Sequence, residues 1–141
     1  MACASGAPDP EPSPDLAPEA VVKIVVGALQ QNDEPSEDAG IATAFRFASP
    51  GNRAATGPLA RFRAMIHSGY SDMLGFRRAT YGEMQFEGDE AAQRVTLFQA
   101  DGSRTTYVFA LSKQRGGECD GCWMTDAVVP VPLEDDGLIR T

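Results

Sequence analysis

An alternation of apolar and polar residues in the C-terminal half constrains this chain more than any other feature. In residues 105–112, Tyr107, Phe109 and Leu111 fall on one side of an extended chain, and smaller or polar residues fall on the other. A period of two is typical of a strand with one buried face. A second such run occupies residues 122–131. Because a two-stranded ribbon is at best marginally stable alone, the pattern predicts a sheet that other elements must cover.

Two further strand-like runs come before these, at residues 78–86 and 93–99. Asp101 and Gly102 form a strong two-residue hairpin signal between the second and third runs. Pro130 and Pro132 end the fourth, because proline has no N–H to donate to a ladder. The chain therefore predicts four sequential antiparallel strands.

Three amphipathic segments precede the strands. The first spans residues 18–31 and the second residues 37–49, where Pro50 disfavours a helical conformation of the residue before it. Residues 51–56 are expected to form a loop, and the third helix begins at residues 57–58. Helices grouped before an antiparallel meander favour an α+β fold, in which three N-terminal helices pack on a strongly bent four-stranded sheet.

The length of 141 residues fits one domain, expected at residues 18–132. Residues 1–17 are rich in proline and acidic residues and predict a mobile tail, and residues 133–141 predict an acidic C-terminal tail. No apolar run approaches the eighteen or so residues of a membrane span, so we expect a soluble protein. The N-terminus lacks the pattern of a signal peptide, although Ala2-Cys3-Ala4 resembles the end of a processing site.

The net charge of −8 is unevenly distributed. Residues 1–44 and 116–141 are strongly acidic, whereas residues 45–115 hold ten basic side chains against six acidic ones. A nucleic-acid-binding protein needs a basic footprint of its own, so this balance disfavours nucleic acid as a partner.

Residues 40–66, with the motif FASPxNRxxTGPLxRF, resemble the family called domain of unknown function 4864, as does WMTDAV at 123–128. The family is similar in organisation to the cone-shaped nuclear-transport-factor-2-like (NTF2-like) proteins. That resemblance implies helices lining a bent sheet with a pocket between them. Family members occur in bacteria and photosynthetic eukaryotes, which implies a plastid location (stroma or thylakoid-associated) if the chain is a processed form, and a cytoplasmic one otherwise.

Cys119 and Cys122 form a CxxC motif in the connection between the last two strands. Free thiols and a disulfide both remain open, whereas a metal site lacks enough further ligands, since His67 is the only histidine. His67 is explained by a helix C-terminus, where the helix dipole favours it. The alternative is an acid–base pair with Asp126, as in some enzymes of the resembled fold.

Tyr81, Tyr107 and Trp123 alternate along strands and are interpreted first as core packing. If the bent sheet leaves a cavity, they become its lining, with Asp126, Thr125 and Glu83 as polar anchors. Five arginines are candidates for contact with an anion or a partner, namely Arg53, Arg61, Arg63, Arg77 and Arg78, although solvated faces or a capped loop explain the same residues.

These patterns favour a non-catalytic module that binds a protein partner, as an accessory subunit docked on a plastid or photosynthetic membrane complex. A homodimer is a further expectation. The alternatives are a binder of a small apolar ligand in the cone, or a His67/Asp126 hydrolase or isomerase. No cofactor or metal is expected, because no phosphate-binding, zinc-binding or nucleophile motif occurs.

Overall fold

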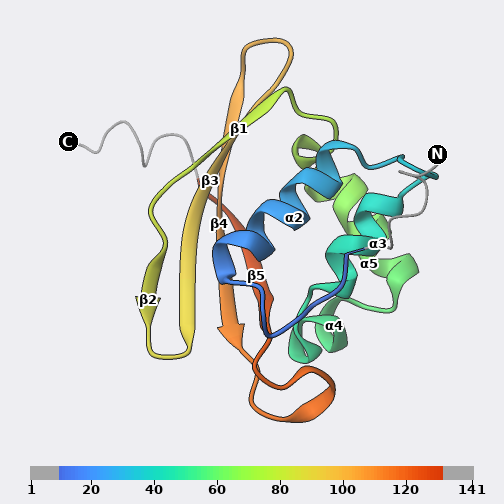
Figure 1. Ribbon diagram of the computed structural model, residues 1–141. Coiled ribbons are helices and arrows are strands. Elements are labelled where there is room, and N and C mark those ends of the chain that lie inside the picture. Colours follow the sequence, from blue (N-terminus) through green and yellow to red (C-terminus); the bar gives the residue numbers. More distant parts are fainter. Residues whose placement is uncertain (1–9, 132–141) are drawn as a thin grey trace, which may run out of the picture.

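The chain folds into an α+β structure in which helices cover one face of a curled antiparallel sheet (Figure 1). The computed structural model describes residues 10–131. The helices in this range are α2 (Pro18–Gln30), α3 (Ala39–Arg46), α4 (Pro50–Thr56) and α5 (Leu59–Gly69), with 3₁₀ turns η1 (Ser71–Met73) and η2 (Gly117–Cys119). The strands are β1 (Arg78–Tyr81), β2 (Gln85–Glu87), β3 (Glu90–Phe98), β4 (Arg104–Lys113) and β5 (Trp123–Val131). The predicted fold class is confirmed.

The sheet is an antiparallel meander with the order β1-β3-β4-β5. Strand β2 also pairs with β3, on the same edge as β1, because the predicted strand at 78–86 is interrupted at residues 82–84. The four-strand prediction is therefore corrected to five strands, the first two being halves of one run. In β5, Asp126 is an extra residue between the Leu111–Thr125 and Ala110–Ala127 pairs, which makes a β-bulge.

The face of the sheet toward the helices, here called the inner face, carries the core. Its residues follow the predicted alternation: Val95 and Leu97 on β3 and Phe109 and Leu111 on β4 are buried. Helix α2 supplies the other half of the core through Val21, Val22, Val25, Val26 and Leu29, all at most 3% exposed. Burial of each such side chain contributes about 1.5–3 kcal/mol, so this contact dominates the stability of the fold.

Helices α2 and α3 approach each other closely at Gly40. A Cβ added at Gly40 would lie 2.1 Å from the carbonyl oxygen of Ala28, which is backbone and cannot move aside. The Gly40 N–H donates to the carbonyl of Asn32 at 2.8 Å, and the Ile41 N–H donates to Asn32 Oδ1 at 2.9 Å. The missing side chain thus lets the two helices touch at backbone distance.

Helix α4 replaces the loop that the sequence predicts at 51–56. Ser49 caps it by accepting the Asn52 N–H, and Pro50 stands at its first position, where its missing N–H is not needed. The second helix ends at Arg46 instead of Ser49, because the chain at 47–49 extends beside β5. There Thr125 donates to the carbonyl of Phe47 and accepts from Ser49, both at 2.8 Å.

Residues 1–9 and 132–141, which hold most of the predicted tails, lie outside the described range. Residues 10–17 are described, and part of the predicted mobile tail contacts the domain. Leu16 packs against the core, and Arg46 Nε donates to the carbonyl of Pro10 at 3.1 Å.

Candidate functional site

A cavity of about 610 Å³ lies between the helices and the inner face of the sheet. Helix α2 and helix α5 provide apolar walls, including Leu29, Phe62 and Ile66, and β4 contributes Phe109. The cavity also has several alanines in its lining, Ala44, Ala48, Ala55 and Ala127. Because these short side chains leave space that a larger residue would fill, the hollow coincides with the alanine-rich part of the interface.

Helix α4 and the end of β5 form the polar side of the cavity. The Asn52 side chain donates from Nδ2 to the carbonyl of Thr125 at 3.1 Å, and Thr56 Oγ1 donates to the carbonyl of Asn52 at 2.8 Å. The hydroxyl of Tyr70 donates to the carbonyl of Val128 at 3.1 Å. These groups satisfy one another, so they shape the wall without needing a ligand.

Thr125 differs from its polar neighbours. It is 4% exposed and borders the cavity, yet its Oγ1 has no hydrogen-bond partner among the described residues. A buried hydroxyl without a partner costs roughly 1–3 kcal/mol. The backbone of Thr125 is fully used at the same time, since it holds Phe47, Ser49 and the Asn52 side chain.

Asp126 is the only charged residue in the cavity lining. It is exposed, it occupies the β-bulge, and its Oδ1 accepts from Ser112 Oγ at 3.0 Å. No Lys or Arg lines this cavity. The interior is therefore suited to uncharged apolar groups, and a carboxylate inside it would have no counter-charge.

The three aromatic residues predicted as pocket lining lie elsewhere. Tyr107 is 3% exposed in the core, and its ring stacks on Tyr70 at a centroid distance of 5.9 Å. Burial, with the nearby Asp72 and Tyr70, raises the pKa of Tyr107 to about 12. Tyr81 lies under Lys23 Nζ, 5.5 Å from the ring centroid, and Trp123 meets Phe86 edge to face. Burial also raises the pKa of Tyr81. Of the predicted polar anchors, Thr125 and Asp126 border the cavity, whereas Glu83 is an exposed residue between β1 and β2.

His67 and Asp126 have different partners. His67 Nε2 lies 2.9 Å from Asp38 Oδ1, and Arg63 Nε lies 3.2 Å from Asp38 Oδ2. Partial desolvation acts to raise the pKa of Asp38, but hydrogen bonds from Asn32 and His67 and the charges of His67 and Arg63 outweigh it, so that pKa is lowered. His67 therefore fastens α5 to the loop before α3, and the structure does not assemble the acid–base pair with Asp126.

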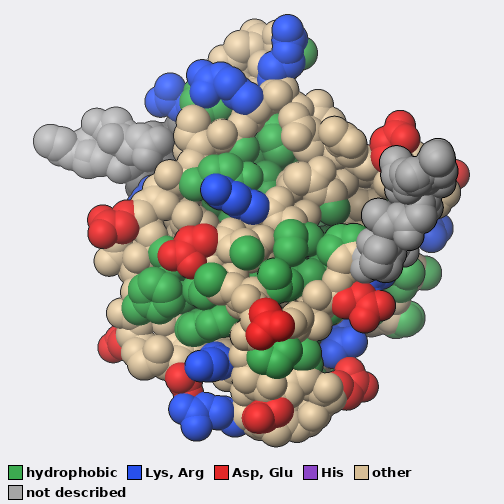
Figure 2. Space-filling model, viewed as in Figure 1, with side chains coloured by type: hydrophobic (Ala, Val, Ile, Leu, Met, Phe, Trp, Pro, Cys, Tyr) green, Lys and Arg blue, Asp and Glu red, His purple; other side chains and the backbone are tan. Residues whose placement is uncertain are grey.

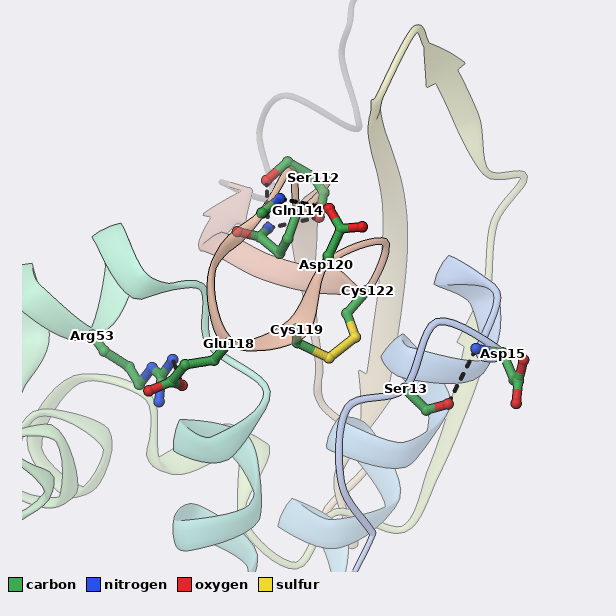
Figure 3. The surroundings of a disulfide bond; sticks show 10 residues. Ser13, Asp15, Arg53, Ser112, Gln114, Glu118, Cys119, Asp120 and Cys122 are labelled. Carbon is green, nitrogen blue, oxygen red and sulfur yellow. Dashed lines mark hydrogen bonds and ion pairs between the residues drawn. A yellow bond between two sulfur atoms is a disulfide. The ribbon is translucent and has the colours of Figure 1, made fainter.

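The CxxC motif takes the disulfide alternative, joining Cys119 to Cys122 in the β4–β5 connection (Figure 3). Arg53 on α4 reaches toward the same connection, where its Nη2 lies 3.7 Å from Glu118 Oε1. Its position beside the disulfide places Arg53 on the side of α4 away from the apolar cavity. Within residues 10–131, no group of three or more His, Cys, Asp or Glu side chains is arranged to hold a metal ion.

The other candidate arginines are dispersed. Arg61 and Arg77 are exposed, Arg63 pairs with Asp38, and Arg78 lies over the Phe98 ring at 3.9 Å. In the described part of the chain, no helix combines the length and the apolar character that crossing a membrane requires.

These features define a small α+β domain with an apolar cavity between its helices and a curled sheet. The chain belongs to the family described as domain of unknown function (DUF4864), whose model matches residues 14–135. No curated protein and no solved structure matches the chain. The NTF2-like resemblance, the protein partner and the plastid location accordingly stay predictions.

Proposed function

We propose that this protein is a non-catalytic carrier or sensor that binds one neutral, largely apolar small molecule in the helix–sheet cavity. The observation that carries the proposal is the cavity itself. Its volume of about 610 Å³ falls within the ~300–1,000 Å³ typical of sites for small ligands. Its lining is mostly apolar, with a few polar groups at one side, which is the usual composition of such sites.

The lining also limits the chemistry of the ligand. Asp126 at the mouth and the lack of a basic lining residue disfavour anions such as fatty acids. Neutral ring systems or alcohols satisfy the apolar walls without bringing an unpaired charge inside. The alternative reading as a hydrolase or isomerase needs His67 at the cavity, and His67 is instead bound to Asp38.

The direct test uses N-phenyl-1-naphthylamine, a neutral apolar fluorophore, titrated into the full chain. We expect saturable binding of one probe per chain, with competition by long-chain alkanols and about tenfold weaker competition by alkanoates of equal length. Ala55 is exposed on α4 and borders the cavity, so Ala55→Trp fills the space without disturbing the core. We expect this variant to bind the probe at least tenfold more weakly.

Ala54→Trp is the matched control, because Ala54 is exposed on the same helix and is not part of the cavity lining. It should bind the probe like the parent chain. Non-saturable binding, or equal affinity in the two tryptophan variants, would rule out this cavity as the site.

A further inference from the structure

The face of the sheet that points away from the helices, here called the outer face, has an apolar centre. The strand register places five small or apolar residues together there, on three neighbouring strands: Ala92, Val108, Ala110, Ala127 and Val129. None of them belongs to the core cluster, and Val129 is 52% exposed. Among the described elements no helix covers this face, since α2 to α5 lie on the opposite side (Figure 1).

The two ends of the outer face carry opposite charges. At one end, the register aligns Arg78 with Phe98 and Phe98 with Arg104, so two arginines flank one aromatic residue. Figure 2 shows Lys and Arg side chains gathered where the β3–β4 hairpin turns. At the other end, Glu87 pairs with Glu90, and Asp126 is held beside them through Ser112.

The acidic end is also hollowed. A shallow depression of about 620 Å³ is bordered there by Glu87, Glu90 and Asp126, with Ala92 and Ala110 from the apolar centre. The bulge in β5 contributes to it, because the extra residue is Asp126 itself. The outer face thus has protruding arginines at one end, an acidic depression at the other and an apolar strip between them.

We propose that the occupant of the outer face is a second copy of this chain, packed face to face with its strands running in the opposite direction. A two-fold axis across the strands brings the basic end of each copy onto the acidic end of the other. Such an interface is self-complementary, as a two-fold dimer requires. A parallel arrangement would oppose Arg104 to Arg104 and Glu90 to Glu90, and like charges across an interface cost several kcal/mol.

The size of the face sets the strength of the contact. With ~3.4 Å per residue and ~4.8 Å per strand, it measures about 27 Å by about 19 Å. Two copies would bury on the order of 1,000 Å², near the lower limit of specific interfaces. We therefore expect a reversible dimer that dissociates at micromolar concentrations and is weakened by salt, since its ends are held by screened charges.

The experiment measures the dimerisation constant of the full chain by sedimentation equilibrium. Arg78→Glu with Arg104→Glu makes both ends acidic, and Glu87→Arg with Glu90→Arg makes both ends basic. Each double variant should dimerise at least tenfold more weakly than the parent chain. An equimolar mixture of the two should form a heterodimer, and the fourfold variant should dimerise by itself again. Arg61→Glu, exposed on α5, is the control and should leave the constant unchanged.

Three results would overturn the proposal: a parent chain that stays monomeric at hundreds of micromolar, dimerisation that salt strengthens, or double variants that dimerise like the control. The cavity is tested separately, because the charge variants lie on the other face of the sheet. They should bind N-phenyl-1-naphthylamine with unchanged affinity, so a failure of either idea leaves the other standing.

Discussion

Helices α2 and α4 border the same cavity but are held in opposite ways. Five residues of α2 are at most 3% exposed, and it forms the centre of the core. Helix α4 has seven residues and none of them is buried. It is attached by Ser49 and Asn52, which both donate to the carbonyl of Thr125, and by the Arg53–Glu118 pair.

The difference separates shape from access. The α2 wall depends on apolar burial, which is lost only when the whole domain unfolds. The α4 wall depends on a few hydrogen bonds and one ion pair, each worth about 1 kcal/mol or less. Segments with few buried contacts open at low free energy. We infer that ligands enter on the α4 side while α2 stays fixed.

The largest expected effect comes from Leu29→Ala in α2. Leu29 is 2% exposed and lines the cavity, so its removal enlarges a hollow and forfeits apolar burial. We expect a loss of about 2–5 kcal/mol in the free energy of unfolding, measured by urea denaturation. Ile24→Ala, on the partly buried side of the same helix, should cost clearly less. Equal losses would contradict the idea that α2 is fixed through its cavity face.

The corresponding change at α4 is Ser49→Ala, which removes the N-cap. We expect a loss of about 1 kcal/mol. Hydrogen exchange should show this loss mainly in residues 50–56, with the amides of α2 unchanged, and exchange of the bound fluorophore should be faster. Ser68→Ala, in the last turn of α5, is the control and should alter neither measurement. Faster exchange spread evenly over both helices would show that the two walls open together.

The contrast between these helices also explains what the sequence could predict. The apolar periodicity of α2 and of β3 and β4 comes from burial, so the pattern predicts both the elements and the α+β arrangement. Helix α4 has no buried residue and therefore no apolar period. Its signal is Ser49 followed by Pro50, an N-cap and first-turn pair that the prediction used only as the end of the preceding helix.

The cavity itself was less predictable. Large aromatic residues such as Tyr107 and Trp123 look like a lining, but they fill space, and the hollow lies where alanines face each other. Alanines on separate helices carry no signal until the packing is known. His67 was explained by a helix C-terminus, yet its partner Asp38 is 29 residues away, and only the close contact of α2 and α3 at Gly40 brings that loop to α5.

A smaller effect is expected at Asp38, which ties α5 to the fixed side of the molecule. Its pKa is lowered in the folded state, so it contributes stability above its unfolded pKa of about 3.9 and loses that contribution as the pH falls through the folded value. Asp38→Asn should therefore reduce stability at pH 7 and flatten the stability profile below about pH 4. Glu37→Gln, an exposed neighbour, should keep the parent profile. An unchanged profile in Asp38→Asn would show that α5 does not depend on this anchor.

The smallest effect, with the opposite sign, is expected at Thr125, where the two kinds of wall meet. Its backbone anchors α4, whereas its Oγ1 has no partner among the described residues. Thr125→Val keeps the backbone and removes only the unpaired hydroxyl, so the free energy of unfolding should rise by up to about 1 kcal/mol. Thr106→Val is the matched control, because Thr106 Oγ1 is hydrogen-bonded to Thr96 at 2.9 Å and its loss should destabilise. If Thr125→Val instead destabilises and speeds exchange in α4, the hydroxyl takes part in holding that wall, and the division between a fixed and a movable side must be redrawn through β5.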